Sequence, residues 1–167
     1  MNGDNCMFIA SVKEAGSLVM CTPLGCFVAK NNAGNQFTRV AEWLFDAYLC
    51  TVQASRHELA AYLAGHNMTL CFEVVVPRLL GDHGYAASEH SADPSRPRGA
   101  YLALTRITRG GDAVSLMDML SVASRFRLPL VEKYIAFDAQ AARALEAIVH
   151  DDDVRCTALF PEITARL

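Results

Sequence analysis

The sequence predicts an α+β fold in which helices flank a mostly antiparallel sheet. Three observations carry this prediction: short apolar runs are bounded by glycine and proline, strands and helices follow one another without a regular βαβ repeat, and residues 68–76 are apolar on both faces. The length of 167 residues suits one core, so we expect a single domain over residues 1–167.

Three short strands are expected at the amino-terminal end, over residues 6–12, 17–22 and 26–29. Gly16 and the turn Pro23-Leu24-Gly25 separate them. Because strands that follow one another through tight turns usually pair, we expect an antiparallel meander. The run over residues 68–76 is the strongest strand signal and is expected at the centre of the sheet.

Two helices are expected between these strands. Residues 38–51 carry apolar side chains at helical spacing, with Thr38 as a candidate N-cap. In residues 56–64, Ser55 opens a capping box and Gly65 supplies the stop signal. The later part of the chain predicts a polar loop, a strand, a helix, a strand and a helix over residues 81–99, 100–107, 116–125, 131–137 and 139–149.

The charge balance restricts the function. The formal net charge is −3, from 15 basic and 18 acidic residues. Because a sequence-independent nucleic-acid binder usually carries a basic excess, any contact with nucleic acid must depend on a local site. Lysine is scarce, and the chain contains only Lys13, Lys30 and Lys133.

The expected location is the nucleus or the cytoplasm. Residues 1–5 lack the basic and apolar regions of a secretory signal, and no apolar run approaches the 18 residues of a membrane span. The six cysteines form no CxxC pair and four of them sit in apolar stretches, which indicates reduced, buried thiols and no zinc site.

The segment Lys13-Glu14-Ala15-Gly16-Ser17 has the KxxG spacing of a nucleotidyltransferase nucleophile. A lysine must lose its proton to attack the α-phosphorus of ATP, and partial burial and neighbouring cations lower its pKa. A glycine three residues later lets the backbone turn tightly and approach the nucleotide. The alternative is an exposed lysine in an ordinary hairpin.

Two further polar features accompany predicted strands. Lys30 and Asn31 begin a turn before a helix, where backbone amides and a lysine suit a phosphate; the alternative is a plain loop. Glu73 is a carboxylate in an apolar strand, which suits a ribose hydroxyl or a metal-bound water; the alternative is a carboxylate on a half-exposed face. Because side chains alternate along a strand, Phe72 and Val74 should point away from Glu73.

Asp82 and His83 lie between two glycines after the same strand. They form a compact polar turn that we expect to face a substrate or a phosphate. A metal site would need more ligands than the neighbouring sequence supplies, so we expect none here.

Taken in order, these segments resemble the ATP-dependent RNA ligases, in the branch that contains bacteriophage RNA ligase and the plant and fungal tRNA ligases. The resemblance rests on Lys13-Glu14-Ala15-Gly16-Ser17-Leu18-Val19, on residues 27–35, on Cys71-Phe72-Glu73-Val74-Val75 and on Leu80-Gly81-Asp82-His83-Gly84. The last of these, together with Phe126-Arg127-Leu128-Pro129, is similar to plant-type tRNA ligases in particular.

The resemblance implies a partial nucleotidyltransferase (RNA ligase) domain that uses ATP and Mg²⁺ on RNA, in the form of tRNA halves. ATP would adenylylate Lys13, AMP would pass to an RNA 5′-phosphate, and a 3′-end would displace AMP to seal the strand. The residues implied in nucleotide binding are Gly16, Ser17, Lys30, Phe72 and Glu73. Those implied in RNA binding are Asn31, Asp82 and His83.

The sequence also departs from the family pattern. Nothing matches the family's later strand with a Glu-Gly signature or its strand with two lysines around one residue, and the chain begins close to Lys13. We therefore expect the central part of an adenylyltransferase domain, weak or inactive alone and completed by a missing remainder. The alternative is a non-catalytic α+β interaction domain that keeps the ligase fold.

Overall fold

The computed structural model describes residues 8–11, 13–14, 16–30, 32–76, 100–131 and 133–136, with 140 and 143. The chain divides into two compact units, one formed by Lys13–Val131 and the other by Met1–Val12 with Glu132–Leu167. The loop expected over residues 81–99 lies outside the described residues, as does most of the helix expected over residues 139–149.

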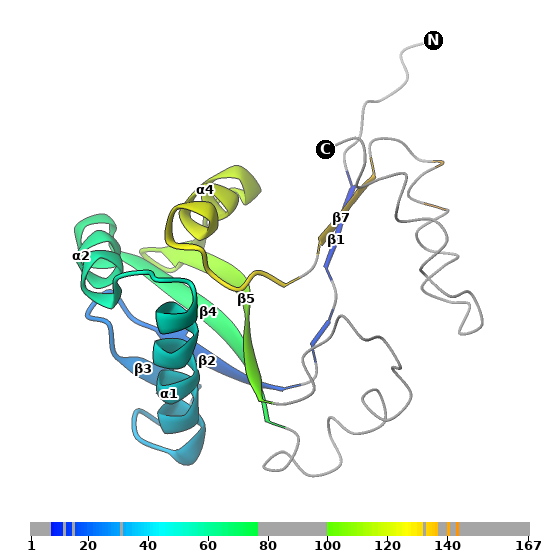
Figure 1. Ribbon diagram of the computed structural model, residues 1–167. Helices are drawn as coiled ribbons and strands as arrows, with labels where there is room; N and C mark the ends of the chain where they lie inside the picture. The colour runs from blue at the N-terminus through cyan, green and yellow to red at the C-terminus, as the bar shows by residue number, and fades with distance from the viewer. Residues whose placement is uncertain are drawn as a thin grey trace. The chain divides into compact units, whose positions relative to one another are not determined.

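The larger unit is built on a five-stranded antiparallel sheet in the order β3-β2-β4-β5-β6 (Figure 1). The strands are β2 (Ser17–Cys21), β3 (Phe27–Ala29), β4 (Met68–Val75), β5 (Tyr101–Arg109) and β6 (Asp112–Ala113). β4 lies at the centre of the sheet, between β2 and β5. This confirms the central position that its continuous apolar run predicts.

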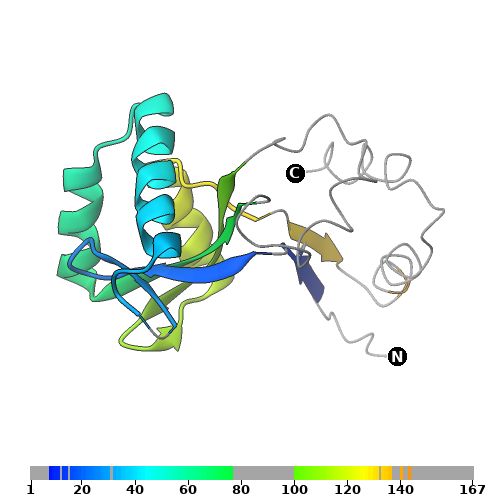
Figure 2. The ribbon, with the colours of Figure 1, turned by 90° about the horizontal axis from the view of Figure 1, so that it is seen from below.

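Three helices cover one face of this sheet: α1 (Gln36–Thr51), α2 (Arg56–His66) and α4 (Leu116–Phe126). Figure 2 shows all three on the same side of the strands. Their buried side chains pack on alternate residues of β2 and β4, among them Val19, Leu70 and Val74. The predicted α+β class, with a mostly antiparallel sheet and flanking helices, is therefore confirmed.

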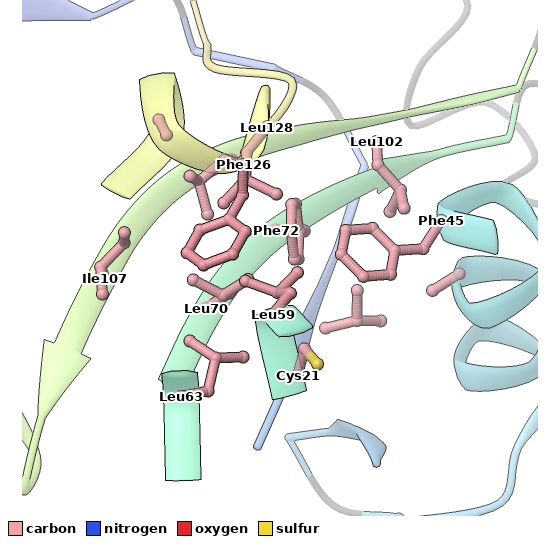
Figure 3. Packing of buried hydrophobic residues seen from close by; sticks show 14 of the residues in the cluster. Cys21, Phe45, Leu59, Leu63, Leu70, Phe72, Leu102, Ile107, Phe126 and Leu128 are labelled. Atoms are coloured by element: carbon pink, nitrogen blue, oxygen red, sulfur yellow. The ribbon is translucent and has the colours of Figure 1, made fainter. Parts of the chain in front are cut away.

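Aromatic side chains lie at the centre of the core. The rings of Phe27, Phe45 and Phe72 have centroids 5.4 to 6.3 Å apart, and come from β3, α1 and β4 respectively. Phe72 and Phe45 are 0% and 1% exposed. Figure 3 shows Phe72 between Phe45 and Phe126 of α4. Aromatic contacts thus join the central strand to β3 and to α1.

The structure corrects two helix signals. Asn35, and not Thr38, caps α1, because the Asn35 side chain accepts the Thr38 N–H at 3.0 Å. Ser55 caps α2 as predicted and accepts the Glu58 N–H at 3.2 Å. However, α2 continues through Gly65 and ends at Asn67, which adopts the left-handed conformation with φ 50°. Asparagine is the second-best residue after glycine for that conformation, so it replaces the expected glycine stop.

Replacing Gly65 with alanine should stabilise the protein. Gly65 lies inside α2, and an added Cβ would meet nothing within 4 Å. Alanine loses less backbone entropy on folding, so we expect the free energy of unfolding to rise by about 0.5–1 kcal/mol in urea denaturation. Gly111→Ala is the matched control, because its φ of +101° is strained for any side chain and the substitution should destabilise. A loss of stability in Gly65→Ala would contradict the helical position of that residue.

The amino-terminal meander is only partly correct. β2 and β3 form the expected hairpin, but β1 (Phe8–Ser11) pairs with β7 (Lys133–Ala136) in a separate two-stranded antiparallel sheet. Phe8 pairs with Ala136 and Ser11 with Lys133, and the Lys133 Nζ donates to the Ser11 hydroxyl at 2.9 Å. The predicted strand was correct and its predicted partner was wrong, because the pairing joins segments that are remote in the sequence.

The pairing of β4 with β5 contains one bulge. Cys71 pairs with Arg106 and Phe72 with Leu104, so Thr105 is an extra residue in β5. The Thr105 hydroxyl donates to the Cys71 carbonyl at 3.1 Å. The bulge allows Leu104 and Ile107, three residues apart, both to be buried against the helices.

The prediction of buried thiols is correct for two of the four described cysteines. Cys21 and Cys71 are buried, whereas Cys26 and Cys50 are exposed. Burial raises the pKa of the Cys21 thiol to about 12, which keeps it protonated and unreactive. Cys21 therefore acts as a small apolar side chain in the core.

Candidate functional site

The candidate site lies on the face of the sheet that points away from the helices. Because paired residues of antiparallel strands share a face, Leu18, Glu73 and Ala103 form one row across β2, β4 and β5. Tyr101 pairs with Val75 in the next row on that face. Glu73 is half-buried, Leu18 is 43% exposed and Ala103 is 5% exposed. This face therefore offers a carboxylate in a partly exposed, partly apolar setting.

Gly16 brings the start of β2 against Glu73. The Gly16 N–H donates a hydrogen bond to the Glu73 carboxylate. A Cβ on Gly16 would overlap the Val74 carbonyl oxygen and lie 2.9 Å from the Glu73 Cγ. A side chain at this position would push the two strands apart, so the close approach depends on glycine. The chain bends at Gly16, and its nearest neighbour there is β4.

The ionisation of Glu73 reflects these surroundings. Burial raises its pKa, the hydrogen bond from Gly16 lowers it, Glu14 raises it by repulsion, and Lys13 lowers it by attraction. The net pKa is raised above the ordinary value. The folded chain thus holds this proton more tightly than the unfolded chain does, so ionisation of Glu73 opposes folding as the pH rises through its folded-state pKa.

Lys13 is within electrostatic reach of Glu73, because its ammonium lowers the pKa of that carboxyl, although this is the weakest of the four effects on it. The Lys13 side chain is exposed, so the partial burial expected for a nucleophilic lysine is not found. The adjoining Ser17 is half-buried and pairs with Val74. Lys13, Gly16 and Glu73 are therefore brought together although Glu73 is far from the other two in the sequence.

Sequence reasoning missed a contact that belongs to this cluster. The Tyr101 hydroxyl donates a hydrogen bond of 2.6 Å to the Glu14 Oε2, and both residues are half-buried. Glu14 follows Lys13 directly, whereas Tyr101 begins β5. The only sequence signal was the position of Glu14 inside the KxxG segment, since nothing local to Tyr101 indicates a partner 87 residues away.

The other predicted site residues are less closely associated. Lys30 is exposed at the end of β3, the edge strand two places from β4, so its backbone is about 10 Å from that of β4. Asn31, Asp82 and His83 lie outside the described residues, and their predicted roles are not tested.

The predicted contact of Phe72 with a nucleotide is wrong. The Phe72 side chain points into the core, where it is fully buried among Phe27 and Phe45. Glu73 occupies the opposite face, as the alternation of the strand requires. The aromatic residue of this motif is a structural residue, and the carboxylate beside it is the one that can reach a ligand.

Two negative findings concern the described residues alone. Within them, no group of three or more His, Cys, Asp and Glu residues is arranged to hold a metal ion by itself. No helix in the same part of the chain is long and apolar enough to cross a membrane.

The comparisons place this fold among known structures. No protein-family model matches the chain, and no curated protein matches its sequence. An archaeal ATP-dependent RNA ligase is similar in structure, with a TM-score of 0.55 and 18% identity over 86% of this chain and 35% of its own. A lysine-to-alanine mutant of Naegleria gruberi RNA ligase with ATP and Mn is similar with a TM-score of 0.57 and 14% identity.

The structural matches cover most of this chain but less than half of each ligase. The Naegleria structure with ATP and Mn is matched over 85% of this chain and 41% of its own length, and a second Naegleria structure, with PPi, over 86% and 41%. This chain thus spans well under half the length of the ligases it matches. This chain, with its antiparallel sheet and three flanking helices, has the nucleotidyltransferase fold of ATP-dependent RNA ligases.

Proposed function

We propose that this chain is the ATP-binding part of an RNA ligase of the tRNA-splicing, plant-type branch, with Lys13 as the residue that forms lysyl-AMP. The observation that supports this most is the close approach of Gly16 to Glu73, with Lys13 within electrostatic reach of that carboxylate, in a ligase fold. A lysine and a carboxylate that can reach the same nucleotide would provide both a nucleophile and an acceptor for ribose hydroxyls.

The chemistry of the proposed first step is a substitution at phosphorus. The deprotonated Nζ of Lys13 attacks the α-phosphorus of ATP, a nitrogen–phosphorus bond forms, and the bond to the β-phosphate oxygen breaks to release pyrophosphate. The amine proton passes to solvent, because Lys13 is exposed. Glu73 holds the nucleotide on the sheet, and Lys30 reaches toward the phosphates from β3.

The site suits a divalent metal only together with a nucleotide. Mg²⁺ commonly binds through one or two carboxylates plus substrate phosphates, and Glu73 and Glu14 supply two carboxylates close enough to repel each other. When bound, Mg²⁺ would neutralise phosphate charge and assist departure of pyrophosphate. The two carboxylates do not form a complete cage, which agrees with a metal that arrives with ATP.

The RNA partner is proposed to be a pair of tRNA halves in the nucleus or the cytoplasm. AMP would pass from Lys13 to an RNA 5′-phosphate, and the 3′-end of the other half would displace it. Since the chain carries a net charge of −3, RNA contacts would be local, at Asn31, Asp82 and His83. The remainder of the ligase would supply the lysines that this sequence lacks, so adduct formation by this chain alone is expected to be slow.

Replacing Lys13 with alanine should abolish covalent labelling by ATP. The wild-type chain, incubated at high concentration with α-labelled ATP and Mg²⁺, should acquire AMP, and mass spectrometry should place it on Lys13. Lys133→Ala is the matched control, because Lys133 belongs to the other unit and donates to Ser11. Its labelling should equal that of the wild type.

Two outcomes would contradict the proposal. Labelling that persists in Lys13→Ala would assign the nucleophile to another residue. A wild-type chain that never gains AMP, alone or with the missing ligase segments added in trans, would favour a non-catalytic interaction domain with this fold.

A further inference from the structure

We infer that Tyr101 is a positioning residue for Lys13, which it holds in place through Glu14. The inference rests on the proposed role of Lys13 and concerns a residue outside the motifs of the sequence. It follows from the route that residues 13–17 take across the open face of the sheet.

The segment before β2 is attached to the sheet at two points. Gly16 donates its N–H to Glu73 of β4, and Glu14 accepts the hydroxyl proton of Tyr101 of β5 at 2.6 Å. β5 is the second neighbour of β2 in the sheet, on the far side of β4. The segment therefore crosses β4, and Lys13 directly precedes the outer attachment.

The bond between Glu14 and Tyr101 is of a strong kind. A hydroxyl that donates to a carboxylate at 2.5–2.7 Å forms a charge-assisted hydrogen bond, and both partners here are half-buried. The bond joins residues 87 positions apart, so it fixes the segment to the sheet and does not merely stabilise a local turn. Lys13 is exposed, so little else restrains it. The attachment of Glu14 therefore restricts the backbone position from which the Lys13 side chain extends.

The same bond holds the Glu14 carboxylate in position. The groups that shift the pKa of Glu73 are the carboxylate of Glu14, the ammonium of Lys13 and the N–H of Gly16. If the Tyr101 hydroxyl is removed, the Glu14 carboxylate loses its donor and can rotate toward the ammonium of Lys13. An ion pair with Glu14 would hold that amine in its protonated, non-nucleophilic form.

Tyr101→Phe tests the inference in the full chain. We expect the rate of lysyl-AMP formation at saturating ATP to fall by about 10- to 100-fold, as loss of one hydrogen bond to a charged group predicts, while the ATP concentration for half-maximal rate changes less. Tyr48→Phe is the matched control, because it also removes one hydroxyl bond, to the Arg127 carbonyl at 2.8 Å, in a different place. Its adenylylation rate should be that of the wild type.

A double substitution shows whether Tyr101 acts through Glu14. In a Glu14→Ala background, Tyr101→Phe should cause a much smaller loss than in the wild-type chain, because the bond between Tyr101 and Glu14 is already absent. Additive losses in the two variants would overturn the positioning role, as would a Tyr101→Phe rate equal to that of the wild type.

A readout that does not need adenylylation separates this inference from the proposed function. Acetylation of Lys13 by acetic anhydride across a pH series, followed by peptide mass spectrometry, should give a different pH profile in Tyr101→Phe and an unchanged one in Tyr48→Phe. If the wild-type chain gains no AMP but these profiles differ, the proposed function fails and the positioning contact stands. Identical profiles in all three proteins would refute the contact.

Discussion

Phe72→Ala is expected to lower the free energy of unfolding by about 3–5 kcal/mol in urea denaturation. Phe72 is fully buried on the central strand and touches the rings of Phe27 and Phe45. Removal of the ring leaves a cavity between the sheet and two helices that the surrounding backbone cannot fill. A loss of this size approaches the whole stability of many single domains, so the variant should be largely unfolded at moderate temperature.

Trp43→Ala is the matched control for that result. Trp43 is also a large aromatic residue, but it is 68% exposed on α1. Its replacement should change the free energy of unfolding by less than about 1 kcal/mol. If Phe72→Ala were no more destabilising than Trp43→Ala, the described core would be wrong and a ligand-facing role for Phe72 would have to be considered again.

Gly16→Ala is expected to reduce both stability and adenylylation. The added methyl group would overlap the Val74 carbonyl oxygen and crowd the Glu73 side chain, so β2 must move away from β4 at its first residue. Overpacking of this kind destabilises by about 1–3 kcal/mol. A shift of about 1 Å in Lys13 would lower the rate of lysyl-AMP formation by roughly 100-fold. Thermal unfolding and α-labelled ATP would measure the two effects on the same sample.

The control for Gly16→Ala is Gly34→Ala, where an added Cβ meets nothing within 4 Å. That variant should keep the adenylylation rate of the wild type and nearly all of its stability. If Gly16→Ala also kept the wild-type rate, contact between the start of β2 and Glu73 would not be needed for the reaction.

Much of the fold could be predicted because the signals are local. The apolar run of β4 indicated a central strand. The spacing of apolar residues indicated α1, and capping signals indicated α2 and α4, each within about two residues of its observed ends. Caps were harder to assign, since Asn35 and Asn67 compete with nearby Thr38 and Gly65 for the same role. Those choices depend on backbone angles that composition does not determine.

The remainder could not be predicted because it depends on contacts between distant segments. The partner of β1 is β7, and the partner of Glu14 is Tyr101. The nucleotide contact expected of Phe72 has a different source, because it follows from the family resemblance alone, whereas the alternation of β4 places Phe72 opposite Glu73. The carboxylate of that motif is where the resemblance and the geometry agree.

The extra residue Thr105 decides where this chain can lose a residue. Without Thr105, Leu104 and Arg106 would be neighbours opposite Phe72 and Cys71, and Leu104 and Ile107 would both still face the helices, because the strand would then alternate regularly. β4 pairs with β2 without an extra residue, so loss of Leu70 would reverse the orientation of one end of β4. A deletion of the Thr105 codon should therefore be tolerated far better than a deletion of the Leu70 codon.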